Sequence, residues 1–213
     1  MKISDIAITF TLITSPVVAV AQDTDLLTLQ QAWAKTTYQT QDQATQLKEL
    51  KKLTEQLQSQ VDANPDDARF LTWLAITQAS TAKAKGGLGA LDYAEAARDN
   101  FERAIALDEA VLDGSALTSL AALYHKVPGW PVSFGDDDEA ESLFKRALEL
   151  NPQGIDPNFF YAEFLYDDGD YQQARQYLEK ARQAAPRPDR PLADEGRHKA
   201  IDELMKKVSK KLS

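Results

Sequence analysis

The chain has 213 residues, which is enough for one domain or for a short solenoid with a continuous core. Hydrophobic residues make up 43% of the chain and charged residues 27%, a balance that is typical of globular proteins rather than disordered ones. The formal net charge is -9, and an acidic chain repels a phosphate backbone, which argues against general nucleic-acid binding. The sequence contains no cysteine, which excludes disulfides, thiol nucleophiles, cysteine-ligated metals and a cysteine-linked lipid anchor.

Residues 1–21 have the layout of a secretory signal peptide. Lys2 precedes a mostly apolar run from Ile6 to Val20, and Ala19-Val20-Ala21 forms a small-x-small cleavage site. We therefore expect cleavage near Ala21 and a soluble periplasmic or secreted protein. The alternative is an uncleaved N-terminal anchor, although the apolar run is short and interrupted for a stable membrane span.

Three later segments share one helical pattern, in which an alanine, a large apolar residue and a second alanine follow at spacings of four and three. These spacings put the three residues on one face of an α-helix. The small residues let a neighbouring helix approach closely, and the large residue fills the space between them. The segments are Ala97, Phe101 and Ala104; Ala140, Phe144 and Ala147; and Ala174, Leu178 and Ala181.

Each of these segments follows another amphipathic stretch with a small residue of its own. Asn151-Pro152 and Ala185-Pro186 end two of the resulting helix pairs, because proline lacks a backbone N–H and clashes with the preceding turn. The sequence therefore predicts helical hairpins in series. The preceding stretches are marked by Leu71, Leu74 and Ala75; by Leu117, Leu120, Ala121 and Tyr124; and by Tyr161, Ala162 and Leu165.

The last hairpin, from Ile155 to Pro188, spans 34 residues and resembles the tetratricopeptide repeat (TPR). Asn158 stands where a large apolar residue is usual in that repeat. The resemblance implies an all-α, right-handed superhelical solenoid of TPR-like helical hairpins, and the alternative is an unrelated hairpin. The residues that carry it are Tyr161, Ala162, Leu165, Gly169, Tyr171, Ala174, Leu178, Ala181 and Pro186.

The rest of the chain is organised around these repeats. We expect N-terminal helices with a half repeat in residues 22–66, three TPR-like units in 67–188, and a C-terminal capping helix in 189–213. Caps are needed because a terminal repeat would otherwise expose its apolar face. Turn insertions fall at residues 85–89 and 129–135. The apolar stripe of the half repeat is Leu50, Leu53, Leu57 and Val61, and that of the capping helix is Leu192, Ile201, Leu204, Met205 and Val208.

A further resemblance covers the stretch from Val127 to Arg197, through Val127-Pro128-Gly129-Trp130-Pro131, Phe134-Gly135 and Phe160-Tyr161-Ala162-Glu163-Phe164-Leu165. These segments resemble the T-component proteins associated with tripartite ATP-independent periplasmic (TRAP) transporters. The resemblance implies a periplasmic partner of a solute-binding receptor. It also leaves open two further properties. Members of that family can form ring-like trimers, which allows a homo-oligomer, and the trimers have a lined channel, which allows a small organic solute.

No set of residues indicates catalysis or a cofactor, so we do not expect an enzyme. The chain has two histidines, and no second histidine stands at metal-ligand spacing from His125. The acidic runs at residues 136–139 and 167–170 are typical of helix caps and turns. Cation binding is the alternative for both runs, although neither follows the order of a calcium loop.

Seven residues are candidates for binding a partner. Two aromatic residues lie in the insertion after residue 127, where they either pack against neighbouring helices or line a ligand or partner site. The repeat register places the other five on the concave inner face, where aromatic and acidic groups would suit a basic or extended peptide. The first group is Trp130 and Phe134, and the second is His125, Phe159, Glu163, Tyr166 and Asp167.

These features together predict a periplasmic TPR scaffold that mediates protein–protein interaction through its concave face and its aromatic loop. The alternative is a solute-binding accessory component of a TRAP-type transporter. A closed tunnel lined by Trp130 and Phe134 would favour that alternative.

Overall fold

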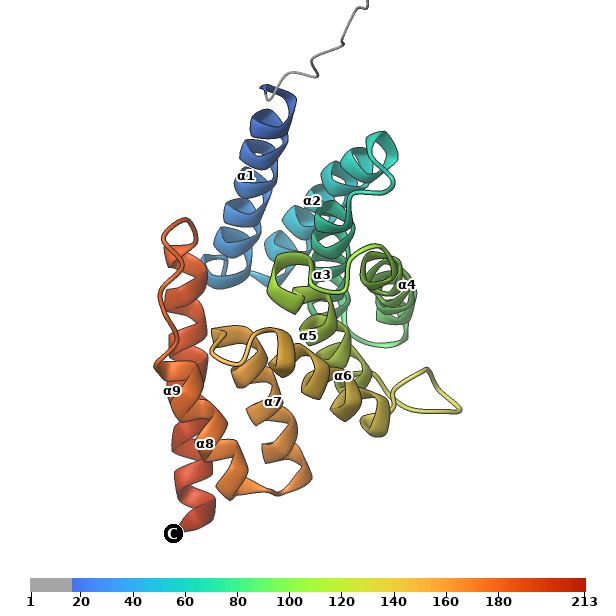
Figure 1. The fold of residues 1–213 in the computed structure, drawn as a ribbon. Helices are drawn as coiled ribbons and strands as arrows, with labels where there is room; N and C mark the ends of the chain where they lie inside the picture. Colours follow the sequence, from blue (N-terminus) through green and yellow to red (C-terminus); the bar gives the residue numbers. More distant parts are fainter. Residues whose placement is uncertain (1–16) are drawn as a thin grey trace, which may run out of the picture.

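The computed structural model describes the backbone of residues 17–213 and the side chains of residues 25–213. Residues 1–16 of the predicted signal sequence therefore lie outside the described residues. Nine α-helices lie in the described part of the chain, and that part contains no β-strand (Figure 1). They are α1 (Val17–Gln39), α2 (Gln43–Ala63), α3 (Ala68–Lys85), α4 (Leu91–Leu107), α5 (Val111–Lys126), α6 (Asp137–Leu150), α7 (Ile155–Asp168), α8 (Tyr171–Arg182) and α9 (Pro191–Leu212).

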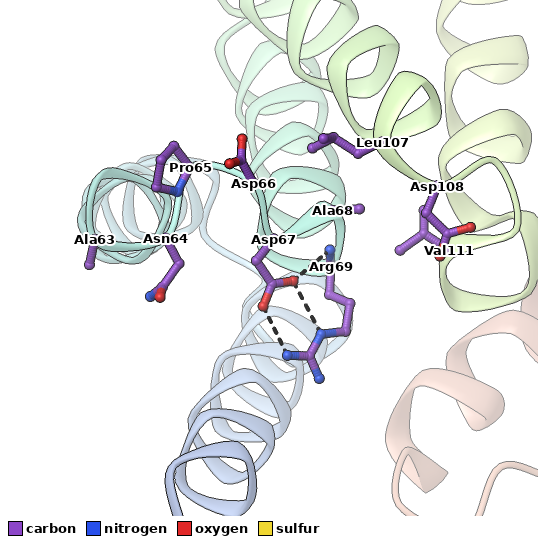
Figure 2. Close-up of a pocket in the computed structure, with 10 residues that line it drawn as sticks. All are labelled: Ala63, Asn64, Pro65, Asp66, Asp67, Ala68, Arg69, Leu107, Asp108 and Val111. Carbon is purple, nitrogen blue, oxygen red and sulfur yellow. Dashed lines mark hydrogen bonds and ion pairs between the residues drawn. The ribbon is translucent and has the colours of Figure 1, made fainter. Parts of the chain in front are cut away.

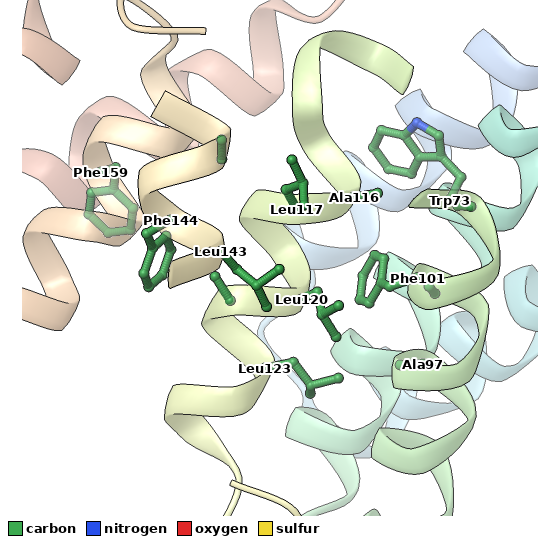
Figure 3. Close-up of a cluster of buried hydrophobic side chains, with 14 of the residues drawn as sticks. Trp73, Ala97, Phe101, Ala116, Leu117, Leu120, Leu123, Leu143, Phe144 and Phe159 are labelled. Atoms are coloured by element: carbon green, nitrogen blue, oxygen red, sulfur yellow. The ribbon is translucent and has the colours of Figure 1, made fainter. Parts of the chain in front are cut away.

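Consecutive helices pack as antiparallel pairs, most extensively α3 with α4, α5 with α6, and α7 with α8. The fold is therefore the predicted all-α, right-handed solenoid of TPR-like hairpins, and α9 is its C-terminal cap. The seam between the helices contains the predicted alanine–apolar–alanine sets, whose nine side chains are each at most 1% exposed. Figure 3 shows Phe101 beside Leu120 of α5. Phe144 packs against the rings of Tyr161 and Phe164 of α7, with centroids 5.7 and 5.8 Å apart. The prediction of a shared apolar seam is confirmed.

Aspartates at the helix starts explain where several helices begin. Asp136 accepts hydrogen bonds from the backbone N–H groups of Asp138 and Glu139, and Asp170 accepts one from Gln173. These side chains satisfy N–H groups that have no partner inside the helix. Gly169 adopts the left-handed conformation that closes α7, with φ of 90°. The acidic runs therefore act as caps and turns in the structure.

The first turn of α5 has an unusual backbone. Leu112, Asp113 and Gly114 have φ values of 49°, 57° and 74°, which lie in the left-handed region. The turn brings Gly114 against α6, where an added Cβ would lie 3.2 Å from the side chain of Leu150. Residues other than glycine are strained in the left-handed region, so Leu112 and Asp113 raise the free energy of the folded state locally. The close packing of the α5–α6 hairpin offsets this strain.

Asn158 is fully buried in α7, at the position where the repeat usually has a large apolar residue. Its side-chain amide donates hydrogen bonds to the carbonyl oxygens of Pro152 and Gly154, at 3.0 and 2.8 Å. The residue therefore ties the turn before α7 to the helix through its NH2 group, while its Oδ1 is buried without a hydrogen-bond partner among the described residues.

The two ends of the solenoid contact each other. Helix α9 packs on α8, as a C-terminal cap should, and it also packs on α7 and α1. Contacts between α1 and α3, α3 and α5, and α5 and α7 complete a closed cycle of the odd-numbered helices (Figure 1). Gly196 of α9 lies so close to the ring of Tyr38 that an added Cβ would overlap it. The sequence predicted a cap at each end but not their contact.

Candidate interaction surface

The loop between α5 and α6, residues 127–136, is fixed by its own backbone. The N–H of Gly135 donates to the carbonyl oxygen of Pro128 at 3.0 Å, and the N–H of Asp136 donates to that of Tyr124 at 3.2 Å. The N–H of Val132 donates to the carbonyl oxygen of Gly129 at 3.1 Å, which closes the tip. The insertion is therefore an ordered hairpin-like turn.

The two aromatic residues predicted for this loop have different environments. Phe134 packs edge-on against Tyr124, with ring centroids 5.5 Å apart, and the guanidinium of Arg98 lies 4.6 Å from its ring centroid. Trp130 is 91% exposed, and Val132 beside it is 54% exposed. Phe134 therefore supports the loop from inside, as the packing alternative predicts, while Trp130 is presented to solvent.

A polar cluster lies where this loop joins the helices. Nδ1 of His125 is 2.7 Å from a carboxylate oxygen of Asp137, and its Nε2 is 3.0 Å from Asp167. Nζ of Lys126 lies 2.6 Å from Asp167 and 3.7 Å from Glu163. We call these five residues the loop-base cluster. It connects both ends of the inserted loop to α7 of the following hairpin.

The electrostatics of the loop-base cluster favour a closed arrangement. Burial by itself would raise the pKa of Asp167, but hydrogen bonds from Lys126 and His125 keep that pKa below its usual 3.8. The ring of His125 also stands edge-on to Phe164, with centroids 5.1 Å apart, so it is held from several sides.

The remaining two predicted residues do not join this cluster. Phe159 was expected on an open concave face, and this was wrong, because its side chain is only 5% exposed. The guanidinium of Arg197, from α9, covers its ring at 4.5 Å. Tyr166 is partly buried against Tyr171, with ring centroids 5.4 Å apart. The capping helix therefore covers part of the surface that the repeat register assigned to a peptide.

Sequence reasoning missed Lys126 and Asp137 as members of the loop-base cluster. Both flank the inserted loop directly, so their position next to an insertion was the available signal. The structure brings together three of the predicted residues, His125, Glu163 and Asp167, and places Trp130 on the loop that the cluster supports.

A shallow hollow lies at the other end of α5, between the α2–α3 and α4–α5 turns (Figure 2). Its volume is about 670 Å³. Asp67 lines it, and its carboxylate pairs with the guanidinium of Arg69 at 2.9 Å, as the dashed lines in Figure 2 show. None of the seven predicted residues lines this hollow, so it is separate from the Trp130 loop.

Two further properties concern the described residues alone. Residues 25–213 contain no group of three or more histidine or acidic side chains placed to hold a metal ion. Among the helices of the same part of the chain, none combines the length and apolar character that crossing a membrane requires.

Comparison with known proteins supports the repeat interpretation for the C-terminal part. Residues 132–194 match the family model described as tetratricopeptide repeat. A solved structure entitled "Crystal structure of MamA" is similar to the chain, with 18% identity, 64% of this chain and 88% of that chain covered, and a TM-score of 0.35. No curated protein matches the chain. The family match covers α6, α7, α8 and the start of α9.

Proposed function

We propose that this protein is a periplasmic TPR-type scaffold that holds a protein partner at the loop of residues 127–136. The observation that carries this proposal is Trp130, whose side chain is 91% exposed at the tip of an ordered loop. Large aromatic residues are favoured anchors in protein interfaces because they bury much area with few rotatable bonds. An ordered loop also loses less conformational entropy when the partner binds.

The loop-base cluster supports this proposal because it fixes the direction in which the loop projects. Lys126, just before the loop, pairs with Asp167 and Glu163 of α7 at 2.6 and 3.7 Å. The ring of His125 bridges Asp137, just after the loop, to Asp167 at 2.7 and 3.0 Å. Surface ion pairs are individually weak, but several of them acting on one short segment restrict its motion together. The partner would therefore meet Trp130 and Val132 in a defined orientation.

The concave face has a smaller role in this proposal than the sequence suggested. Phe159 is covered by α9, and the contact between α1 and α9 connects the two ends of the solenoid. A closed tunnel lined by Trp130 and Phe134 would favour the transporter-accessory alternative. These side chains have different environments, solvent for the first and Tyr124 for the second, so the proposal does not include that alternative.

The periplasmic location is supported by the signal-like residues 1–21. Expression of the full chain in a Gram-negative host, followed by fractionation and N-terminal sequencing, tests it. We expect a periplasmic protein that begins at Gln22. Recovery from the cytoplasm with an intact N-terminus would contradict the location without affecting the binding surface.

Site-specific photo-cross-linking tests the binding surface. A photoreactive phenylalanine analogue placed at position 130 should give a discrete cross-linked product in cells that contain the partner, because this side chain is expected at the interface. The matched control is the same analogue at Leu88, which is 79% exposed in the other turn insertion. Identical products from the two positions, or no product from either, would contradict the proposal.

A substitution gives a quantitative test once the cross-linked partner has been purified. Trp130→Ser should weaken binding by about 2 kcal/mol or more, as expected for loss of an aromatic anchor. Leu88→Ser should leave the affinity unchanged. Because both side chains are exposed, neither substitution should change the thermal stability of the fold, which separates loss of binding from unfolding.

A further inference from the structure

Five charged side chains meet where α9 begins. We call Arg187, Arg190, Arg197, Asp156 and Asp194 the arginine cluster. Asp156 of α7 accepts hydrogen bonds from Arg187 and Arg197, at 2.6 and 2.7 Å. Asp194 of α9 accepts from Nε of Arg187 at 2.6 Å. Three guanidinium groups thus face two carboxylates, so the arginine cluster has one positive charge in excess.

Arg190 holds this excess charge. It forms no ion pair with the side chains of residues 25–213, and its Nε is buried without a hydrogen-bond partner among them. Burial, followed by the nearby charge of Arg187, lowers the pKa of Arg190, although an arginine stays charged at any physiological pH. The charges of Asp156 and Asp194 act on it from a distance but form no ion pair with it. A partly buried cation without a directly paired carboxylate is costly, so its surroundings are suited to an anion.

The aromatic neighbours of Arg190 do not replace an anion. Its guanidinium lies 4.9 Å from the ring centroid of Trp73 on α3, and a ring face attracts a cation without accepting its in-plane N–H groups. Tyr38 of α1 is close enough to act on the charge of Arg190. The ring of Trp73 therefore covers the guanidinium, and the ring of Tyr38 belongs to the same aromatic group through Trp33, which packs edge-on against both.

We propose that Arg190 binds a carboxylate that carries an apolar group. A carboxylate has a single negative charge, which matches the single excess charge of the arginine cluster. Its two oxygens also match the planar fork of a guanidinium. The rings of Trp73 and Tyr38 would contact the apolar group. A doubly charged phosphate would exceed the available positive charge and would lack an apolar part for these rings.

Two sources could supply this chemistry, a small organic acid or the C-terminal carboxylate of a polypeptide. Isothermal titration calorimetry of the full chain distinguishes them. The probes are benzoate, a pentapeptide that ends in leucine with a free carboxylate, the amides of both compounds, and inorganic phosphate. We expect saturation at one site by benzoate or by the free peptide, and no saturation by either amide. The tighter of the two carboxylates identifies the source.

Substitution of Arg190 tests the assignment of the site. Arg190→Gln should lower the affinity for the carboxylate about 10- to 100-fold, because a charge-assisted hydrogen bond is lost. Without ligand, the same variant should be at least as stable as the wild type, because it removes an uncompensated cation. The matched control is Arg182→Gln, an exposed arginine on α8 that pairs with Asp202, and it should bind like the wild type.

Three results would overturn the inference. The first is the absence of saturable binding by every carboxylate, or tighter binding of phosphate. The second is equal affinity of the wild type and Arg190→Gln. The third is a lower stability or unfolding of Arg190→Gln without ligand, which would show that Arg190 stabilises the fold by its contact with Trp73 alone.

Discussion

Asp156 shows how one residue connects distant parts of the chain. Its carboxylate lies on α7 and pairs with Arg187 in the loop before α9 and with Arg197 on α9. Burial opposes ionisation, but the charges of Arg197 and Arg187 outweigh it and lower the pKa of Asp156 to about 2. The capping helix is therefore attached to the last repeat by charge as well as by apolar packing.

This pKa predicts a loss of stability in acid. Because the folded pKa of Asp156 lies below its usual 3.8, its ionised form stabilises the fold above about pH 4 and this contribution disappears as the pH falls toward 2. The contribution is about 2 kcal/mol. Urea unfolding at pH 7, 4 and 2.5 measures it. Asp156→Asn should be less stable at pH 7 by about 3 kcal/mol and should lose less stability on acidification.

Asp202→Asn is the control for this experiment. Asp202 pairs with Arg182 on the surface, where both side chains are more than half exposed. An exposed pair contributes little, so this variant should follow the wild type at all three pH values. Parallel acid curves for the wild type and Asp156→Asn would contradict the role given to Asp156.

At the scale of single elements, the start of α5 combines local strain with close packing. Leu112 and Asp113 have positive φ values, and Asp113 is exposed, so its side chain has no role in the core. The neighbouring Gly114 lies against Leu150 of α6. The left-handed turn is thus maintained by the packing of the α5–α6 hairpin and not by the preference of the residues that form it.

Substitution of Asp113 measures this strain. Because φ is 57° at this position, Asp113→Gly should be more stable than Asp113→Ala by about 1 kcal/mol. Asp99, which is exposed within α4, provides the matched comparison, because glycine there should be less stable than alanine by about 1 kcal/mol. Chemical denaturation of the four variants measures the free energy of unfolding of glycine against alanine at each position. The same order at both positions would contradict a strained backbone at Asp113.

At the scale of the whole molecule, the contact between α1 and α9 closes the cycle of odd-numbered helices. It is formed by Gly196 against Tyr38, and a hydrogen bond from the side chain of Gln31 to the carbonyl oxygen of Asp189, in the loop before α9, adds to it at 3.2 Å. Trp33 extends the same region toward α3, with its ring centroid 5.6 Å from that of Trp73. The first and last helices therefore protect each other's apolar faces.

Gly196→Ala should separate these two helices. An alanine normally stabilises a helix relative to glycine by about 1 kcal/mol, but its Cβ would overlap the ring of Tyr38 here. We expect faster hydrogen exchange in α1, measured by mass spectrometry, and unchanged exchange in the α7–α8 hairpin. Gly89→Ala is the control, since its Cβ would meet only the flexible end of Lys85. Slower or unchanged exchange in α1 of Gly196→Ala would contradict this account.

The sequence by itself determined the helices, their seam and their caps. Periodic spacing within a helix decides which face is apolar, and the aspartates and glycines beside the helices decide where helices begin and end. The capping helix is expected within residues 189–213, and α9 runs from Pro191 to Leu212 in the structure. These features are local, so a single helix and its flanking residues are sufficient to specify them.

Only the tertiary structure decided which predicted surface residues stay exposed. Trp130 and Phe134 are both aromatic residues of one insertion, and contact with Tyr124 and Arg98 partly buries the second while the first remains in solvent. Phe159 is covered because α9 returns over α7. The arginine cluster and the α1–α9 contact likewise join residues far apart in the chain. Their positions depend on the rotation accumulated over all the hairpins, which no local pattern in the sequence specifies.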